Sequence, residues 1–165
     1  MALRVGINGF GRVGRLILRG IVESGRKDVE VVGINDLGSV EMNAHLLKYD
    51  SVHGTLAADI DVDEDTIDVG SGPIKVTAES DPAKLPWKNL GVDVAFECTG
   101  YFKDRESASK HLDAGAAKVL ISAPGQDVDL TVVYGVNSDK LEAHHTVVSN
   151  ASCTTNCLAP VADVL

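Results

Sequence analysis

The chain has 165 residues, a hydrophobic content of 44% and a formal net charge of −9, which suits one ordinary globular domain with a sizeable core. The negative charge argues against a broad nucleic-acid or anionic-membrane surface. No apolar run approaches the roughly 18 residues of a membrane span, and the beginning, MALRVGINGF, has no secretory-signal pattern. We therefore expect neither a nucleic-acid nor a membrane partner.

Three cysteines, Cys98, Cys153 and Cys157, form an odd number without a C-x-x-C pair. This spacing suits neither a zinc site nor a disulfide framework. We therefore expect the protein to be located in the reducing cytoplasm and to bind no metal. Cys98 lies in the apolar stretch VDVAFEC and is interpreted as a small buried residue.

The first elements in chain order predict a strand–helix–strand unit. The apolar run LRVGIN (3–8) is followed by a glycine-rich turn, a helical pattern and a second apolar run, VEVVGIN (29–35). The strand starts are 26 residues apart, which suits a parallel pair. A helix is expected within residues 39–49. Apolar and polar residues then alternate around turn residues, which predicts an antiparallel insertion around residues 57–78.

Apolar runs resume in the second half of the chain. Strands are predicted over residues 92–97, 118–122, 131–134 and 146–149, and a polar helix over 104–115 joins the first two of them. The whole pattern predicts an α/β fold, a Rossmann-type doubly wound and mostly parallel sheet with the antiparallel insertion.

The turn after the first strand contains the motif G-x-G-x-x-G at Gly9, Gly11 and Gly14. In this context the first glycine permits the tight turn, the second lets the backbone approach a pyrophosphate, and the third allows close helix–strand packing. The helix N-terminus offers free N–H groups to the phosphates, and Arg12 adds a full charge. The candidate cofactor-binding residues of this turn are Asn8, Gly9, Phe10, Gly11 and Arg12.

Asp36 closes the second strand, 22 residues after Gly14. An acidic residue at this place accepts hydrogen bonds from an adenosine ribose and repels the 2′-phosphate of NADP, so NAD is the expected cofactor. The alternative, a plain turn with Asp36 as a helix cap, stays open on these residues alone.

The ends of the predicted strands carry small, hydroxyl or amide residues. Because ligands of an open parallel sheet gather outside the carboxyl ends of its strands, we expect these residues to line one polar crevice that also contains Cys153. They are Asn8–Gly9, Asn35–Asp36, Thr99–Gly100, Ser122–Ala123 and residues 149–153.

A helix is predicted from Ser152 or Cys153 onward, with Ser152 or a neighbour as its cap. The positive end of the helix macrodipole favours a thiolate at Cys153, whereas Cys157, one turn later, is expected to pack on the apolar face. A cysteine nucleophile facing a nicotinamide suggests aldehyde oxidation through a hemithioacetal and a thioester. The alternative is a capped helix with a buried cysteine.

The segments NGFGRVGR, IND, HLLKYDSVHG, ECTG and SNASCTTNCLAP resemble phosphorylating, NAD-dependent glyceraldehyde-3-phosphate dehydrogenases, and the likeness covers essentially all 165 residues. The resemblance implies that Cys153 is the acylated thiol and that Ser152 and Thr154 contact substrate or inorganic phosphate. Its further implied cofactor contacts are Arg12 and Val13 at the dinucleotide phosphates, Asp36 at the ribose, Thr99 and Ser122 along the crevice, and Ser80 where the family often has an arginine near the adenine.

The family oxidises glyceraldehyde 3-phosphate to 1,3-bisphosphoglycerate as a cytoplasmic homotetramer of glycolysis. Its base histidine and substrate-phosphate arginine lie further downstream. The resemblance therefore implies an NAD-binding domain over residues 1–150 and the first helix of a truncated catalytic domain over 151–165. The 165-residue chain alone is then expected to bind NAD but to be largely inactive. Two alternatives are an erythrose-4-phosphate dehydrogenase and a stand-alone, non-catalytic NAD-binding module.

Overall fold

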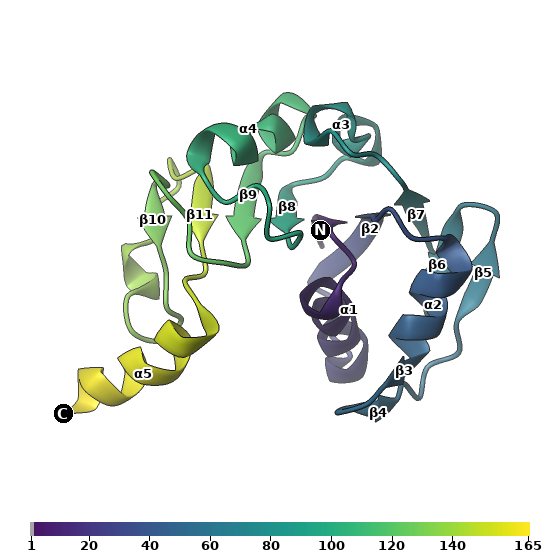
Figure 1. Cartoon of the computed structure of the whole chain (residues 1–165), viewed down its shortest axis with the longest axis horizontal. Coiled ribbons are helices and arrows are strands. Elements are labelled where there is room, and N and C mark those ends of the chain that lie inside the picture. The colour runs from purple at the N-terminus through teal and green to yellow at the C-terminus, as the bar shows by residue number, and fades with distance from the viewer. Residues whose placement is uncertain (1) are drawn as a thin grey trace.

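A computed structural model describes residues 2–165, which form a nine-stranded sheet in the order β10-β11-β9-β8-β1-β2-β7-β6-β5 and a small hairpin (Figure 1). The strands of the large sheet are β1 (Leu3–Asn8), β2 (Val29–Asn35), β5 (Asp61–Asp63), β6 (Thr66–Asp68), β7 (Pro73–Thr77), β8 (Val94–Glu97), β9 (Lys118–Ile121), β10 (Leu130–Thr131) and β11 (Val147–Ser149). The hairpin pairs β3 (Tyr49–Asp50) with β4 (Gly54–Thr55). The helices are α1 (Arg12–Ser24), α2 (Val40–Lys48), α3 (Trp87–Leu90), α4 (Arg105–Asp113) and α5 (Cys153–Val164), with 3₁₀ turns at Pro82–Lys84 and Ser138–Lys140.

The large sheet is wound outward in two directions from β1. This strand pairs in parallel with β2 on one side and with β8 on the other. The parallel pairing continues from β2 to β7, and from β8 through β9 and β11 to β10. The order reverses between β1 and β8, which is where open α/β sheets bind their ligands. The predicted doubly wound, mostly parallel sheet is confirmed.

The predicted insertion extends the same sheet. Strands β5 and β6 are antiparallel, as are β6 and β7. β7, however, also pairs in parallel with β2. The antiparallel insertion around residues 57–78 is thus confirmed in its hairpins, and its last strand is part of the parallel sheet.

Helices cover both faces of the sheet, because successive residues of a strand point to opposite sides. Val31 of β2 belongs to a core with Leu18 of α1 and Leu47 of α2, whereas Val32 packs with Trp87 of α3 on the other face. In Figure 1, α3 and α4 accordingly lie along one side of the sheet and α1 lies on the other.

One predicted strand is much shorter than expected. The apolar run 131–134 predicts a strand, but β10 covers only Leu130–Thr131. The side chain of Asn137 accounts for the difference. It accepts a hydrogen bond from the Val133 N–H at 2.7 Å and donates one to the Thr131 carbonyl at 3.0 Å. The chain therefore turns after Thr131 instead of continuing the ladder.

Asp129 joins β11 to α4 at the far edge of the sheet. Its carboxylate accepts hydrogen bonds from the N–H groups of Thr146 and Val147 at 2.7 and 3.0 Å, and it pairs with Arg105. These contacts, the Val147 N–H above all, hold the pKa of Asp129 below its usual range against the opposing effect of burial.

The first prediction concerns acid stability. Because the pKa of Asp129 is lowered in the folded state, its stabilisation is present above the unfolded value of about 3.9 and is lost as the pH falls below it. Asp129→Asn should lower the free energy of unfolding at pH 7, and the difference from wild type should shrink as the pH falls below about 4. Urea denaturation across this range measures it; a difference independent of pH would contradict the assignment.

Candidate functional site

The glycines of the turn between β1 and α1 are required for different reasons. Gly9 has φ +90°, and a Cβ there would lie 2.6 Å from the Thr99 backbone nitrogen. A Cβ at Gly14 would lie 2.3 Å from the Gly9 carbonyl oxygen. A Cβ at Gly11, the N-cap of α1, would meet no atom within 4 Å. The fold thus requires the first and third glycines, while the second leaves open space at a helix N-terminus, where a phosphate fits.

The carboxylate of Asp36 ties the end of β2 to this turn. Its Oδ2 accepts a hydrogen bond from the Phe10 N–H at 2.8 Å, and its Oδ1 accepts one from the Gly38 N–H at 2.9 Å. An ionised carboxylate has about four acceptor positions, so acceptor capacity remains for ribose hydroxyl groups. Asp36 therefore both fixes the glycine turn and suits the predicted ribose contact.

A cavity of about 330 Å³ lies at the carboxyl ends of β1, β2 and β8. Leu37 and Phe102 give it apolar walls next to the carboxylate of Asp36, an arrangement that suits an aromatic base joined to a ribose. A second cavity of about 330 Å³ lies next to Gly25 and Val29, at the amino end of β2. Open α/β sheets bind ligands at the carboxyl ends of their strands, so the first cavity is the candidate site.

The structure brings together only part of the predicted set of site residues. Those that line the cavity are Asn8, Gly9, Gly11, Asn35, Asp36, Ser80 and Thr99. Those outside its lining are Phe10, Arg12, Val13, Gly100, Ser122, Ser152, Cys153 and Thr154. Phe10 is fully buried beneath the turn, and Val13 is 47% exposed.

Sequence reasoning missed several cavity residues, which are Leu37, Glu79, Tyr101 and Phe102. Leu37 directly follows Asp36, and the two aromatic residues directly follow the strand end Thr99–Gly100. Apolar residues immediately after a polar strand end are the signal that would have indicated them.

Arg12 forms an ion pair with Asp50 of β3. The two Arg12 nitrogens lie 2.8 and 3.5 Å from the Asp50 carboxylate oxygens. The N–H groups of His53 and Val52 also donate to this carboxylate, and with Arg12 they hold the pKa of Asp50 well below its usual range. The predicted positive charge thus lies at the start of α1, and its contact with the dinucleotide phosphates stays a prediction.

The three cysteines have different surroundings. Cys98 lines the cavity, and burial raises the pKa of its thiol to about 11; a hydrogen bond with Ser122 opposes this shift and the charge of Glu97 adds to it. Cys98 is therefore protonated near neutral pH. Cys153 and Cys157 are both exposed. Within residues 2–165 α5 buries none of its residues, so the expected packing of Cys157 on an apolar face stays a prediction.

Cys153 is the first residue of α5, and the predicted cap is confirmed. The Ser152 hydroxyl accepts a hydrogen bond from the Thr155 N–H at 3.0 Å. Just before it, Ala151 has φ +57°, a left-handed conformation that costs a non-glycine residue on the order of 1–3 kcal/mol. The Asn156 amide donates to the carbonyls of Asn150 and Ser152 at 2.7 and 2.9 Å. These bonds hold the strained turn between β11 and α5 and so fix the position of Cys153 at the start of α5.

The register of the sheet relates Cys153 to the cavity. Asn8 pairs with Glu97, Glu97 with Ile121, and Ile121 with Ser149, four residues before Cys153. The cysteine helix therefore starts from the same edge as the glycine turn, three strand spacings or roughly 14 Å along the sheet. A single crevice that includes both stays a prediction.

Two features are absent from residues 2–165. No helix in this range is long and apolar enough to cross a membrane. No group of three or more histidine, cysteine, aspartate or glutamate side chains in the same range is arranged to hold a metal ion.

The glycine turn at a helix N-terminus, Asp36 at the end of β2 and the cavity at the switch point define a Rossmann-type dinucleotide-binding domain. A family model described as "Glyceraldehyde 3-phosphate dehydrogenase, NAD binding domain" matches residues 3–105. The chain belongs to this family, whose cofactor at this domain is NAD.

Relatives named glyceraldehyde-3-phosphate dehydrogenase match the chain along its whole length. The protein from Xanthobacter flavus is 66% identical over 165 residues and that from Cereibacter sphaeroides 63% identical over 165 residues. The protein from Pseudomonas aeruginosa is 57% identical over 166 residues. The chain spans 49–50% of the length of these three relatives.

The second prediction separates the roles of two glycines. Gly11→Ala should change the free energy of unfolding by no more than about 1 kcal/mol, because its methyl group meets only open space. It should weaken NAD binding at least about tenfold, because that space is needed by the pyrophosphate. Gly14→Ala should instead destabilise the fold by about 1–3 kcal/mol through its clash with Gly9.

Calorimetric titration with NAD and thermal unfolding measure both effects. Unchanged NAD affinity in Gly11→Ala would contradict the phosphate assignment.

Proposed function

We propose that this chain is the NAD-binding part of a phosphorylating glyceraldehyde-3-phosphate dehydrogenase. The observation that carries the proposal is an exposed cysteine, Cys153, at the start of a helix that leaves the same sheet edge as the NAD cavity. The names of the relatives support it.

The proposed reaction uses Cys153 as the nucleophile. Its thiolate sulfur would bond to the aldehyde carbon while the aldehyde oxygen takes up a proton, which gives a thiohemiacetal. NAD held in the cavity would supply the acceptor for the hydride of that carbon, and the hydroxyl proton would pass to a general base. The product is a thioester. An oxygen of inorganic phosphate then attacks the thioester carbon, releases the thiolate and gives 1,3-bisphosphoglycerate.

Ser152 and Thr154 are the proposed contacts for substrate or inorganic phosphate. Their hydroxyl oxygens lie 2.9 Å apart at the first turn of α5. Free N–H groups and the positive end of the helix macrodipole favour an anion at this place. Both hydroxyls lie beside Cys153, so a phosphate held here is near the proposed acyl group.

The proposed enzyme has a second domain that begins at about residue 151. Support comes from α5, whose apolar residues are exposed: Leu158 is 67%, Val161 56% and Val164 86% exposed. A face of this kind normally packs against other protein. On the same resemblance we expect a cytoplasmic homotetramer, and we expect the 165-residue chain alone to bind NAD but to be largely inactive, since the family's base histidine lies in the second domain.

The third prediction tests the nucleophile in the full-length enzyme. Cys153→Ser should lower the rate of NADH formation from aldehyde, phosphate and NAD by roughly 10³-fold or more, because the thioester cannot form. Cys157→Ser is the matched control, since it changes an exposed cysteine of the same helix, and it should retain most of the activity. A Cys153→Ser enzyme with full activity would rule out the mechanism.

The same assay distinguishes the substrates. Higher kcat/KM with erythrose 4-phosphate than with glyceraldehyde 3-phosphate would favour an erythrose-4-phosphate dehydrogenase. A native protein of only 165 residues that binds NAD without turnover would favour a stand-alone binding module.

A further inference from the structure

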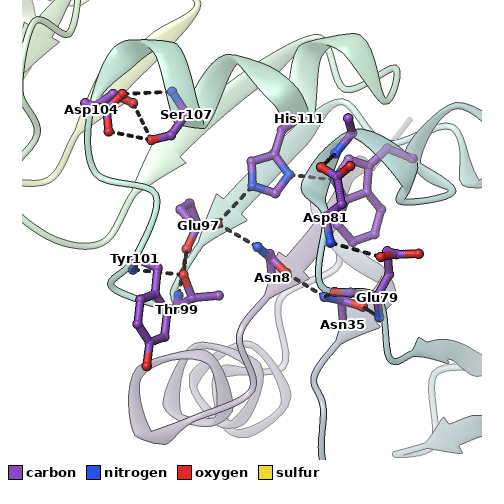
Figure 2. A network of polar contacts seen from close by, with 12 residues as sticks. Asn8, Asn35, Glu79, Asp81, Glu97, Thr99, Tyr101, Asp104, Ser107 and His111 are labelled. Carbon is purple, nitrogen blue, oxygen red and sulfur yellow. Dashed lines mark hydrogen bonds and ion pairs between the residues drawn. The ribbon is translucent and has the colours of Figure 1, made fainter.

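A buried carboxylate lies directly beneath the NAD cavity. Glu97, the last residue of β8, is 1% exposed and receives four hydrogen bonds from three residues. Its Oε1 accepts from the Thr99 N–H at 2.7 Å and from the Thr99 hydroxyl. Its Oε2 accepts from the Asn8 amide at 2.7 Å and from His111 Nε2 at 2.9 Å (Figure 2). All four contacts supply hydrogen-bond donors, which suits the acceptor oxygens of a carboxylate.

Trp87 of α3 and His111 of α4 determine which group donates and which accepts in the bond between His111 and Glu97. The Trp87 indole N–H lies 2.9 Å from His111 Nδ1, and an indole nitrogen only donates. His111 Nδ1 is therefore an acceptor, the ring proton is on Nε2, and this N–H points at Glu97. Both His111 and Trp87 are fully buried, so water does not offer them other partners.

Glu97 also determines how the side-chain amides of Asn8 and Asn35 are oriented in the neighbouring strands. Because Glu97 only accepts, the Asn8 amide nitrogen faces it and the Asn8 oxygen faces Asn35, whose amide nitrogen donates to it at 2.7 Å. The Asn35 nitrogen also donates to the Glu79 carbonyl at 2.8 Å, and the Asn35 oxygen accepts from the Glu79 N–H at 2.8 Å. Figure 2 shows this row from His111 to Glu79.

Two segments attached to this network line the cavity and are called its two walls here, one at Thr99 and one at Glu79. Thr99 donates directly to Glu97, Glu79 ends the row, and both line the cavity together with Asn8 and Asn35. Asp36, the predicted ribose contact, also lines the cavity, so on the proposed function the cavity receives the adenosine part of NAD. We propose that Glu97 is a positioning residue for NAD, whose carboxylate holds both walls of the adenosine cavity at the spacing the cofactor needs.

A purely structural role would not require a charge at this position. Apolar side chains of similar volume fill buried sites at equal or lower cost than a desolvated carboxylate. What the carboxylate adds is a set of fixed directions, since each of its partners is oriented by donating to it. The proposal rests on the NAD site described above and is independent of the chemistry at Cys153.

The fourth prediction uses Glu97→Gln, which keeps the shape and removes two acceptor positions. The NH₂ group of the glutamine must face either the donors of Thr99 or the donors of Asn8 and His111. The hydrogen bonds on that side are lost, and the wall that they held is no longer fixed. We expect the affinities for both AMP and NAD to fall at least about fivefold, as loss of hydrogen bonds to a charged group implies. Calorimetric titration of the 165-residue chain measures both.

The matched control is Asp129→Asn. Asp129 is also a carboxylate that accepts backbone N–H hydrogen bonds, and it lies outside the cavity lining. Asp129→Asn should lower the melting temperature and leave the affinities for AMP and NAD within about twofold of wild type. Affinities that fall equally in the two variants would show a general loss of stability and would overturn the positioning role, as would an unchanged affinity in folded Glu97→Gln.

A second pair of variants keeps the test decisive where Glu97→Gln does not fold. His111→Leu removes one donor to Glu97, while His111→Gln retains an amide donor and an acceptor for Trp87. Weaker AMP binding in His111→Leu and its restoration in His111→Gln support the proposal; equal affinities in both and in wild type overturn it. Emission from Trp87, the only tryptophan, reports whether each variant keeps its buried network.

If the wild-type chain bound neither AMP nor NAD, the dinucleotide site itself would be wrong and the proposal would fall with it. If wild type bound both and the variants bound equally well, only the role of Glu97 would be wrong. Dehydrogenase activity enters neither comparison.

Discussion

One row of backbone pairs at the carboxyl edge of the sheet determines where every functional group of this domain lies. The row runs from Thr77 through Asn35, Asn8, Glu97 and Ile121 to Ser149. Parallel pairing brings the ends of these strands to one edge, and the reversal of strand order between β1 and β8 opens the sheet there. The glycine turn, the cavity and the cysteine helix all follow directly from members of this row.

Polar side chains along the row connect folding to binding. Residues that are paired neighbours in the sheet, such as Asn8 and Glu97, also exchange side-chain hydrogen bonds. Within residues 2–165 no buried side-chain nitrogen or oxygen lacks a partner, so the network costs little of what buried polar groups usually cost. Asp36 makes the corresponding connection on the exposed side, because it holds the Phe10 N–H and still lines the cavity. The site is therefore largely pre-formed by the fold.

Most of the fold was predictable because its signals are local. Apolar runs gave nearly every parallel strand, and the strand over residues 29–35 has the predicted bounds. The strand predicted over 131–134 is too long, because the side-chain amide of Asn137, six residues after Thr131, donates a hydrogen bond to the Thr131 carbonyl. The packing of Cys157 stays a prediction, because an apolar helix face does not tell which protein surface covers it. The network of Glu97 was not predictable, since its bond to Asn8 joins residues 89 positions apart and depends on strand order.

We expect one NAD molecule to lie along this edge, with its adenosine in the cavity and its nicotinamide toward the cysteine helix. An amide NMR titration of isotope-labelled chain tests it directly, first with AMP and then with NAD. AMP should shift the amide signals of Gly11, Gly38 and Thr99, and NAD should in addition shift those of Ser122 and Cys153. NAD shifts confined to the AMP set, or centred on Gly25 and Val29 at the other cavity, would contradict it.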